Sequence, residues 1–182
     1  PESLPLGRHL LQLCMNDGGG DGALLAAPAH CYEPQSLVSG RRLWGVAVQL
    51  YTLRSAANWG MGDFADLSTV VRLCAGQGAA FIGLNPLHAL FPSNPGHYSP
   101  YSPSSRHFLN VMYIAVPEVP GYAQCTAARE LVESAEFQQE LTRLRATDYV
   151  DYQGVARAKL PVLATLYDHF RRTELDRHTE QG

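Results

Sequence analysis

The sequence predicts an α/β fold, and two observations support that prediction. Two nearly continuous apolar runs, residues 43–53 (LWGVAVQLYTL) and 79–90 (AAFIGLNPLHAL), are typical of strands buried on both faces of a parallel sheet. A segment with helical periodicity lies between them, and this order of strand, helix and strand predicts a βαβ unit. The 182 residues suffice for one domain with a core, or for one domain plus part of another.

The composition argues against several classes of function. Hydrophobic residues make up 46% and charged residues 17% of the chain, as in ordinary soluble globular proteins. The net charge is -3 with no block of like charges, so we expect neither a nucleic-acid partner nor a membrane partner. No apolar run approaches the ~20 residues that a transmembrane helix needs.

The N-terminus and the cysteines indicate the compartment. The first residues lack the pattern of a signal peptide, and the chain begins with Pro1 rather than Met, which suggests a segment of a longer protein. The four cysteines are far apart without a CxxC pair, which favours free thiols over a disulfide framework. His88, His97 and His107 do not have the spacing of metal ligands. We therefore expect a cytoplasmic protein without a metal site.

The N-terminal region predicts a hairpin. Residues 4–34 contain two apolar runs on either side of DGGGDG (17–22), and a Gly/Asp cluster between β-type runs predicts a turn. We expect this hairpin to be the end of a small β domain, followed by a polar connector at 35–42. The expected domain boundaries are therefore 1–40 and 41–182.

The helix between the two apolar runs has a recognisable start and end. Asp63 is well placed as its N-cap, and Asp66 favours the positive end of the helix. An apolar stripe at helical spacing begins at Phe64. Gly76 or Gly78 is expected to end the helix.

The rest of the chain predicts one more strand and then helices. The strand is expected at 108–116 (FLNVMYIAV). Residues 127–146 and 151–172 have helical periodicity, and the apolar stripe of the second segment includes Lys159. Pro161 lies inside this segment, where it removes one backbone hydrogen bond and is expected to kink the helix at a cost of ~3 kcal/mol.

Two long loops follow the predicted strands of the βαβ unit, at residues 54–62 and 87–106. Ligands bind at the C-terminal ends of strands in parallel α/β folds. Both loops combine aromatic rings, which stack on the apolar face of a sugar, with hydrogen-bonding side chains. The candidates are Trp59, Tyr98 and Tyr101 for stacking, and Asn58, Ser99 and Ser102 for hydrogen bonding. Packing of these rings onto the scaffold explains the same composition equally well.

The carboxylate pair that glycoside chemistry requires is not evident in either loop. Asp63 and Asp66 have the positions of helix-start residues instead. The GMGD segment at 60–63 lacks the pattern of a phosphate-binding loop.

Several motifs together resemble the 4-alpha-glucanotransferase (amylomaltase) family. They are WGVAVQLYTLRSAANWGMGDFADL (44–67), GLNPLHAL (83–90), SPYSPSSR (99–106), the LN pair at 109–110, and the VDYxxVAxxK pattern at 150–159. LPLGRHLLQL and CYEP are similar to the end of the β domain that precedes the barrel in longer bacterial members. The resemblance covers nearly the whole chain and is strongest from 43 to 116.

This resemblance implies a fold and an activity. The fold would be the beginning of a (β/α)8 barrel with a helical insertion, preceded by the end of a small β domain. The activity would be transfer of 4-alpha-glucan segments between maltooligosaccharides by a retaining double displacement, with an Asp nucleophile, a Glu acid and no cofactor. The implied partner is a maltooligosaccharide or a starch-derived glucan.

The resemblance also assigns roles to individual residues. It places Tyr101 against the sugar at the cleavage site, with Ser99 beside it. Trp59 and Asn58 are substrate-binding candidates from their loop. Asn110 matches an Asn at the start of the next strand and is interpreted as structural. The catalytic acids of the family belong to strands after residue 182, so no catalytic residue is expected in this chain.

Two alternative functions are open. One is a non-catalytic glucan-binding module or truncated paralogue that has the aromatic loop without the acids. The other is part of an alpha-amylase-type hydrolase, which the NWGMGDF and SPYSPSSR blocks fit poorly. An incomplete barrel would also leave open sheet edges and an exposed apolar helix face, so self-association of the chain is expected.

Overall fold

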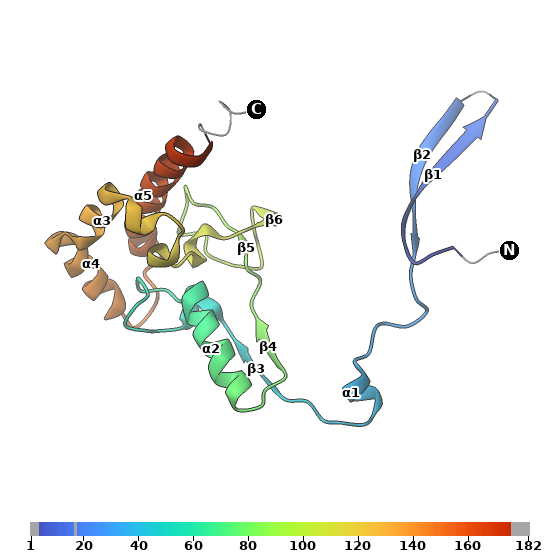
Figure 1. Ribbon diagram of the computed structural model, residues 1–182, viewed down its shortest axis with the longest axis horizontal. Helices are drawn as coiled ribbons and strands as arrows, with labels where there is room; N and C mark the ends of the chain where they lie inside the picture. Colours follow the sequence, from blue (N-terminus) through green and yellow to red (C-terminus); the bar gives the residue numbers. More distant parts are fainter. Residues whose placement is uncertain (1–3, 17, 176–182) are drawn as a thin grey trace. The chain divides into compact units, whose positions relative to one another are not determined.

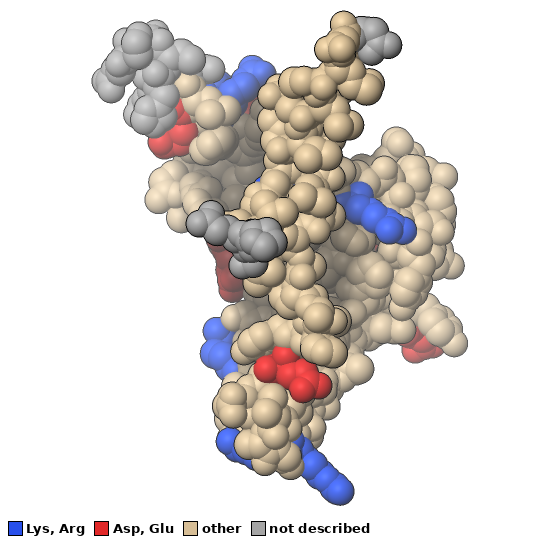
Figure 2. Space-filling view, turned by 90° about the vertical axis from the view of Figure 1, so that its right-hand side faces the viewer, with Lys and Arg blue, Asp and Glu red and all other residues tan. Residues whose placement is uncertain are grey.

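The computed structural model describes residues 4–16 and 18–175. It contains two compact units, Pro1–Leu43 and Trp44–Gly182 (Figure 1). Within the described ranges, no helix is both long and apolar enough to cross a lipid bilayer. On the face that Figure 2 shows, charged side chains lie singly or in small groups between uncharged ones.

The first unit contains a hairpin and a short helix. Strands β1 (Gly7–Met15) and β2 (Gly18–Ala26) pair antiparallel along their full length, and α1 (Gln35–Val38) follows. The hairpin was expected, but the expectation that residues 17–22 form its turn is wrong, because β2 already begins at Gly18. A Cβ atom at Gly19 would lie 2.5 Å from the Leu13 carbonyl oxygen across the ladder. Gly19 therefore permits close pairing of the two strands.

The second unit begins with the predicted βαβ unit. Strands β3 (Gly45–Val48) and β4 (Phe81–Leu84) are parallel neighbours, and α2 (Phe64–Gly76) connects them. Both strands are shorter than the apolar runs, and the first run continues into the 3-10 turn η1 (Leu50–Thr52). Burial of both sheet faces, expected from the sequence, is not seen, since β3 and β4 form a two-stranded sheet in the described chain.

The start of α2 has the predicted cap. The Asp63 carboxylate accepts hydrogen bonds from the backbone N–H groups of Ala65 (3.0 Å) and Asp66 (3.2 Å). The Asp66 carboxylate accepts in return from the Asp63 N–H at 3.0 Å. This reciprocal capping box satisfies N–H groups that have no partner inside the helix, and it fixes where the helix begins.

The segment after β4 differs from the prediction. Strands β5 (His88–Ala89) and β6 (Ser105–Leu109) pair antiparallel. The expected strand at 108–116 ends at Leu109, because the Asn110 side chain accepts a hydrogen bond from the Met112 N–H at 3.1 Å and starts a 3-10 turn. The short turns that follow are η2 (Val111–Tyr113), η3 (Val116–Glu118) and η4 (Tyr122–Gln124).

The last third is helical, as predicted. It contains α3 (Thr126–Glu133), α4 (Ala135–Arg145), α5 (Tyr152–Phe170) and the π-helical turn η5 (Arg171–Leu175). Ser134 is extended and separates α3 from α4, and its hydroxyl accepts from the Phe137 N–H at 3.3 Å. Helix α5 continues through Pro161. Pro161 and Arg157 are both exposed, so water can bond the Arg157 carbonyl that proline leaves without its helical donor.

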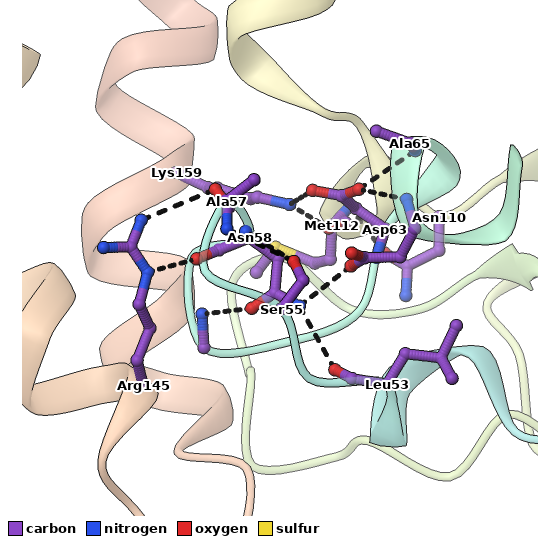
Figure 3. A network of polar contacts seen from close by, with 12 residues as sticks. Leu53, Ser55, Ala57, Asn58, Asp63, Ala65, Asn110, Met112, Arg145 and Lys159 are labelled. Atoms are coloured by element: carbon purple, nitrogen blue, oxygen red, sulfur yellow. Dashed lines mark hydrogen bonds and ion pairs between the residues drawn. The ribbon is translucent and has the colours of Figure 1, made fainter. Parts of the chain in front are cut away.

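The core of the second unit forms where these helices meet the turns after β6. Its buried residues include Leu50, Trp59, Tyr113, Val116, Leu141, Leu144, Val155, Val162 and Leu166. Lys159 of α5 lies among them and is 0% exposed. Its ammonium group donates to the Met112 carbonyl at 2.7 Å and lies 3.9 Å from the Asp63 carboxylate (Figure 3).

Burial shifts the titration of both members of this ion pair. It lowers the pKa of Lys159 to about 8, although the charges of Asp63 and Asp66 oppose this shift. It also raises the pKa of Asp63, against the effect of Lys159. The environment therefore disfavours each charge, and each is retained beside the other in a core that supplies hydrogen-bond partners.

The close approach of the loop to α4 predicts the effect of substitutions at two glycines. Gly60 has φ +86°, and a Cβ there would lie 2.7 Å from the Leu144 Cβ, whereas Gly78 has φ +81° with open space around it. We expect Gly78→Ala to lower the free energy of unfolding by about 1 kcal/mol through backbone strain. Gly60→Ala should cost about 1–3 kcal/mol more because of the clash. Urea unfolding of both variants tests this, and equal losses would contradict it.

The depressed pKa of Lys159 predicts how stability changes with pH. The unfolded lysine, with its ordinary pKa of 10.5, binds more protons between pH 8 and 10.5 than the folded one, so the free energy of unfolding rises with pH in this window. The full contribution is at most ~3 kcal/mol. Urea unfolding at pH 8 and pH 10 should show the wild type gaining relative to Lys159→Met, in which this titration is absent. A constant difference between the two proteins would refute the assignment.

Candidate functional site

An open hollow lies at the C-terminal ends of β3 and β4, where the fold class predicts a ligand site. Its volume is about 590 Å³. The lining residues come from the two strands, from the turn after each strand, and from the 87–106 loop: Ala47, Val48, Gln49, Thr52, Gly83, Leu84, Asn85 and Tyr101. The hollow therefore combines an apolar floor with amide, hydroxyl and phenol groups.

Tyr101 reaches the hollow from the tip of a turn. The Ser102 N–H donates to the Ser99 carbonyl at 3.2 Å, which closes a four-residue turn with Pro100 at its second position. Pro100 is buried, while the Tyr101 side chain is 69% exposed. Ser99 is half-buried at the base of the turn, and Ser102 is exposed. The turn thus presents one aromatic ring to the hollow.

The loop that carries this turn is fixed at both ends. β5 and β6 pair antiparallel, so the chain leaves and returns at the same place. The Ser104 N–H donates to the Ala89 carbonyl, and the Asn110 N–H donates to the Leu87 carbonyl, both at 2.9 Å. Asn110 is 4% exposed and caps η2, in agreement with its expected structural role.

Asn85 connects the ends of β3 and β4, and it is not among the site residues predicted from the sequence. Its side-chain oxygen accepts from the Leu50 N–H at 2.8 Å, and its amide donates to the Tyr113 hydroxyl at 3.1 Å. Burial raises the pKa of Tyr113, so this hydroxyl stays protonated at neutral pH. The signal in the sequence was an amide at the end of an otherwise apolar run, where a buried polar group needs partners.

Trp59 and Asn58, both predicted to bind substrate, have structural positions. Trp59 is 3% exposed and packs edge-on against Phe137 of α4, with ring centroids 5.1 Å apart. Asn58 is 2% exposed, and its side chain bonds the Leu53 carbonyl, the Gly60 N–H and the Asp66 carboxylate. The physical reason is that α4 covers this loop, so neither side chain is open to a ligand.

Two arginines attach the same loop to the end of α4. Arg145 donates from Nε to the Asn58 carbonyl at 2.7 Å (Figure 3). Arg54 donates to the Gly60 carbonyl at 2.8 Å and to the Thr147 carbonyl at 3.2 Å. Guanidinium groups suit this task because their donors point in several fixed directions. Loop 54–62 is therefore part of the scaffold.

Tyr98, a candidate for sugar stacking, stacks on another tyrosine. Its ring lies parallel to that of Tyr152, with centroids 4.3 Å apart and an interplanar angle of 2°. Tyr51 also contacts Tyr152, with ring centroids 6.3 Å apart. Burial, followed by the neighbouring Tyr51, raises the pKa of Tyr152 to about 12. One face of Tyr98 is thus occupied by protein.

The two carboxylates at the start of α2 have structural tasks. Asp63 and Asp66 form the capping box of α2, and Asp66 also accepts from the Asn58 amide at 2.8 Å. Neither lines the hollow, whose described lining contains no carboxylate. This arrangement can bind a sugar through the Tyr101 ring and nearby amide and hydroxyl groups, but it holds no acid or base pair for glycoside chemistry.

Comparisons with known proteins show which proteins this chain resembles. A family model described as 4-alpha-glucanotransferase matches residues 48–181. The 4-alpha-glucanotransferase of Haemophilus influenzae is 38% identical over 171 residues, which are 94% of this chain and 24% of that protein. The 4-alpha-glucanotransferase of Mycobacterium tuberculosis is 41% identical over 127 residues, which are 66% of this chain and 17% of that protein.

A solved structure matches as well. The crystal structure of amylomaltase from Corynebacterium glutamicum superimposes with a TM-score of 0.78 at 35% identity, over 92% of this chain and 24% of that one. The chain thus spans about a quarter or less of the length of the relatives that it matches. The family model covers most of the chain, and this chain therefore belongs to the 4-alpha-glucanotransferase family.

Proposed function

We propose that the protein carrying this chain is a 4-alpha-glucanotransferase that moves 4-alpha-glucan segments between maltooligosaccharides. Family membership supports the reaction class, and the exposed Tyr101 ring at the strand-end hollow is the structural observation that carries the assignment. The reaction would be a retaining double displacement in which an acceptor hydroxyl, rather than water, resolves the glycosyl-enzyme. No cofactor is part of this proposal, and the cytoplasm is its proposed location.

Within that enzyme, the chain would supply the beginning of the barrel and one wall of the sugar site. We propose that residues 41–182 form the first part of a (β/α)8 barrel with a helical insertion, and that 1–40 end a preceding β domain. The parallel β3–β4 pair with its connecting α2 and the match to an amylomaltase structure support this architecture. The catalytic acids would come from strands that the chain does not contain.

The role proposed for the hollow follows from its chemistry. The Tyr101 ring would lie against the apolar face of a glucose unit. Ser99, which starts the same turn and lies outside the described lining of the hollow, would bond a hydroxyl group. Asn85 bonds both Leu50 and Tyr113, so it would keep the floor of the hollow in one shape. The chain would therefore bind and orient the glucan without taking part in bond cleavage.

A non-catalytic glucan-binding protein is the second candidate. The observation that favours it is the hollow itself, whose described lining has a stacking ring and no carboxylate. This candidate shares the sugar contact with the first and differs in lacking turnover. Activity of the protein that carries the chain distinguishes the two.

Substitution of Tyr101 tests the proposed sugar contact. In the longer protein, Tyr101→Ala should lower kcat/KM for maltotriose disproportionation about tenfold, equivalent to ~1.4 kcal/mol of lost transition-state binding. Tyr101→Phe retains the ring and should retain most of the activity. Tyr167→Ala, at an exposed tyrosine of α5 outside the hollow, is the matched control. Wild-type kcat/KM in a folded Tyr101→Ala variant would exclude the contact.

The isolated 182-residue chain should not disproportionate maltotriose, because the described lining of the hollow contains no carboxylate, and Asp63 and Asp66 form the cap of α2. Chromatography of glucose and longer dextrins measures this, with the Haemophilus influenzae relative as positive control. Robust turnover by the chain alone would place the catalytic acids inside it.

Light scattering on the same sample tests the self-association that the exposed Leu73, Phe81 and Phe108 favour.

A further inference from the structure

Three tyrosines join the two strand-end loops to the start of the longest helix. Tyr51 lies in η1 after β3, Tyr98 lies in the loop after β5, and Tyr152 is the first residue of α5. We call these three residues the tyrosine cluster. Tyr152 is its centre, since it stacks on Tyr98 at 4.3 Å and contacts Tyr51 at 6.3 Å between centroids.

Contacts made by α5 and by the residue before it fix the position of Tyr152. Asp151 caps α5 by accepting from the Gly154 N–H at 2.8 Å. Arg143 of α4 donates to the same Asp151 carboxylate at 2.8 Å and to Glu140 at 2.7 Å. Further along α5, Lys159 donates to the Met112 carbonyl. The ring of Tyr152 therefore stands on a helix end that is held by a cap, an ion pair and a buried hydrogen bond.

Tyr98 connects Tyr152 to the turn that carries Tyr101. Only Ser99 and buried Pro100 separate the two tyrosines, and Ser99 is also the first residue of the turn. Just before Tyr98 in the sequence, the His97 ring stacks on the Phe91 ring, with centroids 4.6 Å apart. This contact closes the earlier half of the loop on itself. The loop thus meets the helical insertion through one parallel ring contact directly beside the turn.

One of the two cavities that border the cluster has room for water only. The cavity lined by Tyr51, Phe91, Tyr98, Tyr113 and Tyr152 has a volume of about 30 Å³, enough for one or two water molecules. A glucose ring does not fit there. A larger open hollow of about 380 Å³ also borders the three tyrosines, together with Thr52, Arg54, Asp148, Tyr149 and Val150. Tyr152 covers one face of the Tyr98 ring beside this hollow. The parallel contact of Tyr98 with Tyr152 joins the loop to α5, and this contact carries the supporting task of the stack.

We propose that Tyr152 is a positioning residue: through its stack on Tyr98 it holds the Ser99–Ser102 turn so that the Tyr101 ring stays in the hollow. This inference rests on the proposed function, since it adds a support for the same sugar contact. It also assigns the helical insertion a task in substrate binding, although no residue of α5 lines the hollow.

The first experiment measures the loop without any reaction. Hydrogen–deuterium exchange of the longer protein should report on the loop amides of His97, Ser102 and Ser104, which are hydrogen-bonded in the native loop. Tyr152→Ala should speed their exchange about tenfold, since the stack is lost. Tyr152→Phe, which retains the ring, should exchange like the wild type, and so should Tyr167→Ala. Unchanged exchange in Tyr152→Ala would overturn the proposal.

The second experiment measures catalysis in the longer protein. Tyr98→Ala and Tyr152→Ala should each lower kcat/KM for maltotriose about tenfold, mainly through KM, because the sugar-contacting ring loses its orientation. The double variant should be no worse than either single one, since both remove the same contact. Tyr152→Phe should restore activity. Additive losses would overturn the proposal, because they would mean that Tyr98 contacts the sugar by itself.

The two experiments separate this inference from the proposed function. If Tyr101→Ala has wild-type activity while Tyr152→Ala loosens the loop, the sugar contact fails and the supporting stack stands. If Tyr101→Ala loses activity while the loop of Tyr152→Ala exchanges like the wild type, the sugar contact stands and the supporting role of Tyr152 fails.

Discussion

The buried ammonium group of Lys159 must be surrounded by oxygen acceptors, and this requirement connects three parts of the fold. An uncompensated charge in a core costs several kcal/mol, so a lysine is tolerated there only where partners converge on it. The Met112 carbonyl comes from the turn after β6, and the Asp63 carboxylate comes from the cap of α2. Helix α5 is thereby held against both segments, and its first residue, Tyr152, is held beside the strand-end loops.

The helices and the βαβ unit could be predicted from the sequence because their signals are local. The capping residues Asp63 and Asp66 are three positions apart, and the apolar stripe of α5 placed Lys159 on the buried face. The strand predicted at 108–116 failed for an equally local reason. The side chain of Asn110 accepts a hydrogen bond from the backbone N–H of Met112, and the chain turns there. The apolar pattern of the segment does not reveal this bond.

The candidate site was predictable in position and less so in its residues. Both loops follow strand ends, as the fold class requires, and Tyr101 does line the hollow there. Trp59 has a similar setting in the sequence, yet it is buried under α4. The same apolar ring serves for packing and for sugar stacking, so composition cannot separate the two tasks. The decisive partner, Phe137, lies far along the chain and has no local signal.

The bonds between loop 54–62 and the end of α4 also bear on how the chain folds. Arg145 and Asn58 are 87 residues apart in sequence, and Arg54 and Thr147 are 93 residues apart. Closing a loop of this length costs conformational entropy before any bond can form. We expect loop 54–62 to reach its native form late, after α4 and α5 have assembled. The contacts that bury Trp59 thus raise the contact order of the fold, a property that goes with slower folding.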